Sequence, residues 1–404
     1  SQHQAYLYRA SSQSVNELLK QFSSISNAQL LRLSELLEEL TDAERKALQG
    51  LNFAGRGRAS KRIEEIKAIL NEWFDSLNVE LSADFEKSAI ALAVYEASYA
   101  AKLLGETAVA ISGAEAYKTI RKTPYAGGQL VDYLFKDIAA SLRKKVEYVI
   151  RDGISQGQTN QQIVQRIKGK REKVDGGYSY IGGMLEAERN VIERQVRTAR
   201  SHVSTSVYID TYKAAGYEYV KVVATLDGRT CKYCASIDGD VYSIDDPARP
   251  RFPVHPNNRT TYVGCDKDGE IGGVRPFVMD ERKVKDIPKD ERKHLIGQLD
   301  ANTSFKEFFK QSDEFFQRTW LGETKYKLYK KGEYSIDKFA DPLNKRGYTL
   351  AELKALDKKP LNYWVFKYNN HHYFNQTENN NETFRISSLC NCIEQLFCFN
   401  SKRL

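Results

Sequence analysis

Apolar residues recur at every third or fourth position along most of this 404-residue chain, which is the period of an amphipathic α-helix. Residues 60–104 show the pattern most clearly, and no proline interrupts them. The apolar positions there are Ile63, Ile66, Leu70, Phe74, Leu77 and Leu81. This spacing predicts one long helix, or two nearly continuous ones, that packs through a single face. Such a length is more typical of a stalk or lever than of a catalytic scaffold, although long helices also build ordinary bundles.

The same period predicts further helices at 129–152 and 184–214, and a short helix that begins after Thr159. Residues 1–56 differ, because polar breaks near Ser26 and at Thr41 divide the apolar pattern. We therefore expect several short helices there. The predicted fold class is mainly α, with long helices.

Residues 221–265 depart from the helical period and predict a small, compact α+β module. A β-branched run at 222–225 predicts a strand, and Thr230 is placed to cap a single helical turn. That turn brings Cys231 and Cys234 to one face. A second strand is expected at 240–244, and a proline-rich arm then returns His255 to the cysteines.

The order of residues in this module resembles the signature of the phage head morphogenesis family, the Mu F-like minor head proteins. The residues that carry the resemblance are Asp227, Arg229, Thr230, Cys231, Cys234, Asp238, Gly239, His255, Pro256 and Arg259. The resemblance extends over residues 185–355. It implies a structural protein of a tailed bacteriophage that associates with portal and capsid proteins in head assembly and acts in DNA delivery. It also implies a place in the virion or prohead after synthesis in the bacterial host cytoplasm.

Cys231, Cys234 and His255 are candidate zinc ligands, but a closed zinc site needs four. In the family, His-Pro is followed by Cys-Arg-Cys, where this chain has Asn258 and Thr260. Cys265 or a water remains to complete the site, although the spacing of Cys265 is not that of the family. A site completed by water would be open, and one completed by Cys265 would be closed. The alternative is a metal-free cluster of two protonated, buried thiols, with His255 bonded to the backbone or to Asp227. We favour this alternative, so no cofactor is predicted and zinc stays the candidate metal.

No catalytic constellation is recognisable, and we expect the protein not to be an enzyme. A phosphate-binding GxxxxGK[ST] loop is absent, as is the His-x-Glu of zinc deaminases. Cys231 has no evident third partner for nucleophilic catalysis. The alternative functions are a zinc-containing nucleic-acid-binding module and a virion protein that carries a nuclease or toxin.

Charge and composition agree with these expectations. A net charge of +8 permits contact with packaged DNA, and residues 166–173 form the densest basic cluster. The glycine pairs at 176–177 and 182–183 predict a mobile loop, or a backbone contact, around Tyr178 and Tyr180. No apolar run has membrane-spanning length, and the polar start predicts no secretory signal. The CxxC motif fits a reducing compartment.

We expect five regions. They are an N-terminal helical region (1–125), a helical linker (126–184), the Mu F-like core (185–300), a C-terminal helical module (301–360) and an Asn-rich tail (361–404). Within them, residues 266–293 are predicted to form an irregular surface arm. The aromatic short helices at 305–320 are predicted to offer anchors for a partner protein.

Overall fold

The computed structural model describes residues 2–53, 55, 59–105, 112–174, 177–332 and 334–357, with side chains from residue 9 onward. By compactness the chain divides into residues 1–347 and 348–404. In the second unit the described helix is α13 (Leu350–Asp357), which Thr349 and Glu352 cap reciprocally. The predicted tail at 361–404 lies outside the described residues.

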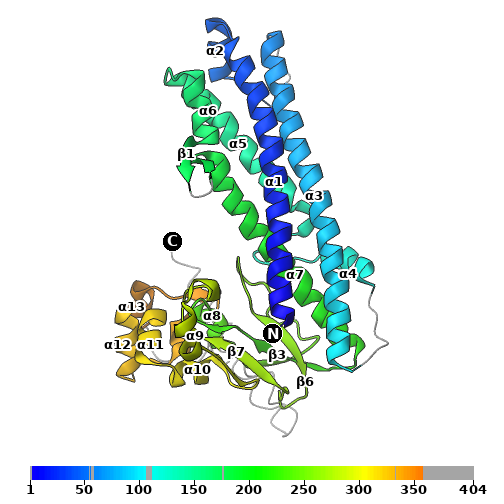
Figure 1. Cartoon of the computed structure of the whole chain (residues 1–404), viewed down its shortest axis with the longest axis vertical. Helices are drawn as coiled ribbons and strands as arrows, with labels where there is room; N and C mark the ends of the chain where they lie inside the picture. Colours follow the sequence, from blue (N-terminus) through cyan, green and yellow to red (C-terminus); the bar gives the residue numbers. More distant parts are fainter. Residues whose placement is uncertain are drawn as a thin grey trace, which may run out of the picture. The chain divides into compact units, whose positions relative to one another are not determined.

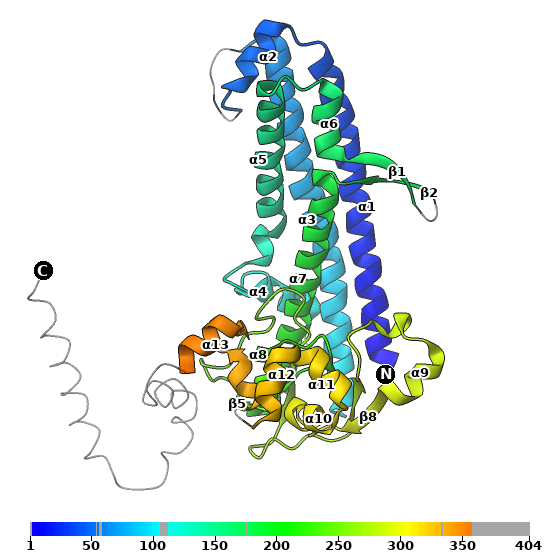
Figure 2. The same ribbon diagram turned by 90° about the vertical axis from the view of Figure 1, so that its left-hand side faces the viewer.

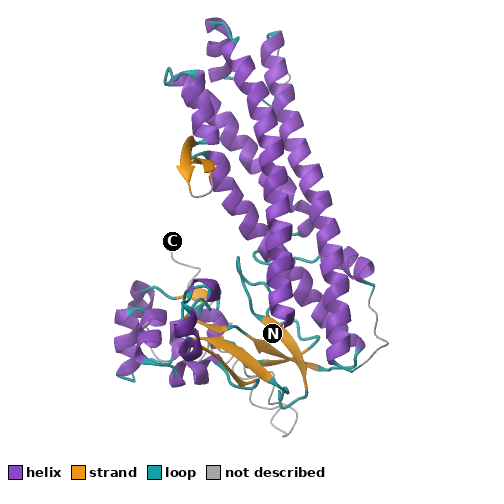
Figure 3. Cartoon of the chain, in the orientation of Figure 1, coloured by secondary structure: helices purple, strands orange, loops and turns teal. Residues whose placement is uncertain are grey.

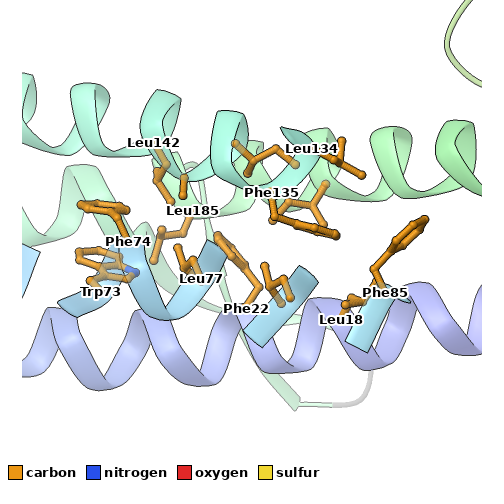
Figure 4. Packing of buried hydrophobic residues seen from close by; sticks show 14 of the residues in the cluster. Leu18, Phe22, Trp73, Phe74, Leu77, Phe85, Leu134, Phe135, Leu142 and Leu185 are labelled. Carbon is orange, nitrogen blue, oxygen red and sulfur yellow. The ribbon is translucent and has the colours of Figure 1, made fainter. Parts of the chain in front are cut away.

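Long helices dominate the first unit (Figures 1 and 3). They are α1 (Gln2–Glu38), α3 (Lys61–Leu103), α5 (Leu134–Ser155) and α7 (Met184–Ala214). Helix α3 contacts the other three, so it is the centre of the bundle. Figure 4 shows the core that they share, in which Phe22 of α1, Trp73 and Phe85 of α3 and Phe135 of α5 are buried.

The predicted helix at 60–104 is confirmed as α3, which begins after Ser60 as its N-cap. All six of its predicted apolar positions are buried, none more than 4% exposed. Ile69 and Trp73 are buried as well, so the apolar face is wider than the six positions indicate. The face must be wide because three long helices pack on it. Val79, by contrast, is 64% exposed, so another side of α3 faces solvent.

The prediction of several short helices before residue 41 is wrong, because α1 runs unbroken through Ser26. Ser26 is fully buried inside this helix, and its hydroxyl accepts a hydrogen bond from Trp73 Nε1 at 3.1 Å. A buried hydroxyl with a partner can stand inside a helix at little cost. Thr41, in contrast, does start a new helix, through a capping box with Glu44.

Shorter helices connect and flank the long ones. In the bundle they are α2 (Asp42–Gln49), α4 (Gly113–Ile120), η1 (Val131–Tyr133) and α6 (Asn160–Lys168). Later in the chain they are α8 (Lys232–Ser236), η2 (Val284–Asp286), α9 (Lys289–Leu295), α10 (Phe305–Gln311), α11 (Glu314–Leu321), α12 (Glu323–Lys330) and η3 (Ile336–Phe339).

Two small three-stranded sheets form the β part of the first unit. One has the order β5-β3-β6, from β5 (Val241–Ser243), β3 (Tyr219–Val223) and β6 (Thr261–Cys265), all antiparallel. The other has the order β4-β7-β8, from β4 (Leu226–Asp227), β7 (Val274–Val278) and β8 (Ile296–Asp300), with β4 parallel to β7. Two-residue strands β9 (Ala340–Asp341) and β10 (Arg346–Gly347) pair separately. The predicted fold class, mainly α with a small α+β module, is therefore confirmed.

Two predicted irregular segments are regular. The expected loop around Tyr178 and Tyr180 is a strand of an antiparallel hairpin, β1 (Lys170–Val174) with β2 (Gly177–Ile181). The expected surface arm at 266–293 contains β7, η2 and the start of α9. The strand signal is weak in both segments. The hairpin strands are exposed, and β7, which contains Pro276, forms by pairing with β4 and β8.

Candidate site at the Cys-x-x-Cys turn

The turn that carries both cysteines is α8, and its N-cap is Cys231, one residue later than predicted. Cys231 Sγ accepts a hydrogen bond from the backbone N–H of Cys234 at 3.3 Å. The Thr230 hydroxyl instead donates to the carbonyl of Thr225, which lies between β3 and β4. Because a cap residue and the third residue after it share one face, the turn points both sulfurs the same way. The prediction that they share a face is therefore confirmed.

His255 closes this group from the proline-rich arm, as predicted. Its Nε2 lies 3.2 Å from Cys231 Sγ and 3.4 Å from Cys234 Sγ. Its Nδ1 lies 2.9 Å from the carbonyl of Pro256, so the backbone, and not Asp227, orients the ring. The arm is held by α7, where Thr198 Oγ1 accepts from the N–H of Asn257 at 3.1 Å.

Asn258 is the fourth side chain of the cluster, and it is 3% exposed. Its Nδ2 donates to Cys234 Sγ at 3.0 Å and lies 3.2 Å from His255 Nε2. Its Oδ1 accepts from the backbone N–H of Thr260 at 3.2 Å, which fixes the orientation of the amide. The side of Asn258 that faces the cysteines and the imidazole is therefore an NH₂ group, which has no lone pair to offer a metal.

The environment shifts the pKa values of the two thiols in opposite directions. Hydrogen bonds from the Cys234 thiol, His255 and the Cys234 backbone N–H lower the pKa of Cys231, although burial alone would raise it. The hydrogen bond to Cys231, burial and the Cys231 charge raise the pKa of Cys234. The hydrogen bond with Cys231 raises the pKa of His255. Cys231 is thus the more acidic of the two thiols, and it is also the more accessible one, since it is half-buried.

The donor set does not fit a closed zinc site. Among the described residues, Cys231, Cys234 and His255 form a group whose potential ligand atoms lie within 4.8 Å of one another. Cys265 is not in that group. Cys265 is the last residue of β6, where it pairs with Tyr219, whereas Asn258 precedes the first residue of that strand. A tetrahedral site would need a fourth protein donor, and the Asn258 NH₂ group that touches the cluster cannot serve.

Two buried carboxylates hold the surrounding motif together. The first is Asp227, which accepts from both guanidinium nitrogens of Arg259 at 2.5 and 2.7 Å and from Arg229 at 3.2 Å. Burial alone would raise the pKa of Asp227, but the hydrogen bond and charge of Arg259, with help from Arg229, lower it overall. This bidentate pair links Arg259, which follows the His-Pro arm, to Asp227, which precedes the cysteine turn.

The second carboxylate, Asp238, joins three segments that are far apart in sequence. It accepts from the backbone N–H groups of Ala224 and Phe305, each at 2.6 Å. Both of its oxygens also bond Arg275 of β7 at 3.1 Å. The Asp238 side chain is fully buried and that of Arg275 is 9% exposed. Each charge is thus satisfied only by the other and by backbone groups, which makes the pair a structural joint.

The aromatic short helices pack against this joint and do not face solvent. Phe305 and Phe309 are fully buried, and their rings each lie 5.0 Å from that of Trp320. Trp320 Nε1 donates to the carbonyl of Thr230 at 2.7 Å, directly before the cysteine turn. The prediction that these aromatics anchor a partner is wrong, because this chain itself occupies them. Phe315 is the exception, at 76% exposed.

The basic cluster at 166–173 leads into an exposed hairpin, which Figure 2 shows projecting from the helices as β1 and β2. Arg171 lies over the Tyr178 ring at 4.4 Å and Lys168 over the Tyr180 ring at 4.3 Å. Lys170 and Lys173 stand on the same exposed strand. The predicted patch is therefore solvent-accessible and presents both positive charge and aromatic faces.

Some of these roles could not be read from the sequence. Arg275 and Trp320 lie outside the signature, and only the folded chain brings them to it. The sequence marks Asn258 only as a departure from the Cys-Arg-Cys that the resemblance implies, and the folded chain shows that it donates to Cys234. The residue type carries this signal, because an Asn in place of a Cys exchanges a metal ligand for a hydrogen-bonding group.

Residues 144–263 match the family model described as phage Mu protein F like protein. The match includes α7, the cysteine turn, His255 and both buried carboxylates, and it ends two residues before Cys265. It confirms the resemblance predicted from the signature and indicates a bacteriophage head-related protein. No curated protein and no solved structure matches the chain. None of the described helices is long and apolar enough to cross a membrane.

Replacing Asp238 with alanine is expected to lower the free energy of unfolding by about 3–5 kcal/mol, because it leaves the Arg275 charge buried without its partner. The matched control is Asp245→Ala, since Asp245 pairs with Lys213 but its side chain is 75% exposed. That control should cost less than about 1 kcal/mol. Urea unfolding of both variants checks the expectation, and equal small losses would contradict the structural role of Asp238.

Proposed function

We propose that this chain is a structural minor head protein of a tailed bacteriophage, which associates with portal and capsid proteins during head assembly. The match of residues 144–263 to the Mu F-like family is the observation that carries this proposal. The arrangement of the signature supports a structural role. Asp227 and Asp238 are buried carboxylates engaged in ion pairs within the chain, so neither is available to act on a substrate.

We propose further that the protein is not an enzyme. His255 and Cys231 lie within hydrogen-bonding distance, as a nucleophile and base would, but Cys234 and Asn258 crowd the same imidazole nitrogen. The other buried histidine in the bundle, His202, stacks on Tyr125 and bonds the carbonyl of Ile120. It belongs to the core, and among the described residues no second imidazole joins the cysteine cluster.

The proposal is tested by quantitative mass spectrometry of proheads and mature virions purified from infected cells, with an abundant host protein as the measure of contamination. We expect the chain to be enriched with the portal protein in proheads, at a fixed ratio across gradient fractions. Its presence only in the particle-free lysate would contradict the proposal. That result would favour the alternative of a nucleic-acid-binding module without a virion role.

We also propose that the protein contacts packaged DNA, and that it does so through the β1–β2 hairpin. Exposed lysine and arginine side chains bind phosphates without regard to sequence, and aromatic faces stack on bases. The cation–π contacts of Arg171 and Lys168 hold these side chains along the hairpin. The resulting surface is suited to non-specific binding.

Exchanging Lys170 and Lys173 for glutamate should therefore weaken binding to duplex DNA and make the slope of log affinity against log salt less steep by about 2, because each lost phosphate contact removes about 0.9. Fluorescence anisotropy over a salt series measures this slope. The control carries Lys285→Glu and Lys289→Glu, two exposed lysines that lower the net charge equally. Equal slopes in the two double variants would show that the hairpin is not the DNA-binding surface.

A further inference from the structure

The Cys-x-x-Cys turn combines three features that a reversible disulfide requires. The Sγ atoms of Cys231 and Cys234 lie within 4.8 Å of each other. They project from one turn, in which Cys231 Sγ accepts the N–H of Cys234, so a modest side-chain rotation brings the sulfurs together. The two thiols also differ in access, because Cys231 is half-buried whereas Cys234 is 2% exposed.

We propose that Cys231 and Cys234 form a reversible dithiol–disulfide pair, in which Cys231 attacks a small-molecule disulfide such as oxidised glutathione and Cys234 resolves the mixed disulfide. The assignment of roles follows from access. Only the half-buried sulfur can be approached by an external disulfide, and only the buried one is placed to attack it afterwards. Each protein molecule reduces one external disulfide, and no catalytic turnover is expected.

The Cys231 thiol passes its proton to the His255 imidazole, 3.2 Å away, and its sulfur forms a bond to one sulfur of the external disulfide. The S–S bond of that disulfide breaks, and the released thiolate takes the proton from His255. The Cys234 thiol then passes its proton to the neutral imidazole, 3.4 Å away, and attacks the Cys231 sulfur. The second external thiolate leaves and takes that proton. The external disulfide is reduced to two thiols, and the protein dithiol is oxidised to one disulfide.

Asn258 and Thr260 distinguish the surroundings of this cysteine pair from those that the family resemblance implies. Where the family places two cysteines, this chain places a buried amide that donates to Cys234 and a threonine beside it. The exchange removes the thiolates that would complete a metal site and leaves one isolated sulfur pair. Under the proposed function, such a pair would be assembled in a compartment where thiols are kept reduced and would leave it with the particle.

The test is a redox titration of the full chain in glutathione buffers, followed by alkylation and peptide mass spectrometry. Trypsin cleaves after Lys232, so the two cysteines are read separately from each other and from Cys265. In the wild type, we expect Cys231 and Cys234 to oxidise together. Doubling both glutathione species at a fixed ratio should halve the ratio of disulfide to dithiol, because two glutathione molecules are released for each one consumed.

Two variants separate the roles. In Cys234→Ser, Cys231 should stop at the mixed disulfide with glutathione, and its fraction should not change when both species are doubled. In Cys231→Ser, Cys234 should stay unmodified, as should Cys265, while circular dichroism confirms the fold. Wild-type cysteines that stay reduced throughout, or that take up glutathione independently, would overturn the proposal. This readout does not require particles, so it can fail or succeed separately from the proposed function.

Discussion

The buried Asp238 carboxylate is the constraint on which the Mu F-like module depends. It fixes the end of the cysteine turn to the backbone after β3, to Arg275 of β7 and to the first residue of α10. These segments share no local sequence signal, and a charge removed from water must find all its partners within the protein. Once they are joined, Trp320 can reach the carbonyl before the turn, and the position of the cysteines follows.

The signature therefore divides into two kinds of residue. Asp227, Arg259 and Asp238 build the frame, through ion pairs in which both carboxylates are buried. Cys231, Cys234 and His255 form the chemically reactive part inside that frame. The frame keeps its ion pairs although Asn258 and Thr260 stand where the resemblance implies cysteines. We propose that these ion pairs can hold the loops of the module without a metal.

The helical fold could be largely predicted from sequence, because the period of apolar residues is a local property. It placed α3 almost to its ends and found the starts after Ser60 and Thr159. The unbroken α1 could not be predicted, since Ser26 is read as a break unless Trp73 is known to lie against it. The burial of the aromatics of α10 and α11 could not be predicted for the same reason. In the site, the proline-rich arm and the resemblance predict that His255 joins the cysteines, whereas Cys265 is a candidate only by residue type, and its place in the sheet keeps it out of the cluster.

Cys231, Cys234 and His255 form an incomplete donor set for zinc. Metal analysis of the chain purified without chelator tests this most directly. We predict well below one zinc per chain in the wild type, and the same in Cys265→Ser. We predict about one zinc per chain when Asn258→Cys and Thr260→Cys together restore the family's ligands, because the four thiolates and the imidazole then supply enough donors. About one zinc in the wild type that is lost in Cys234→Ser would contradict the account.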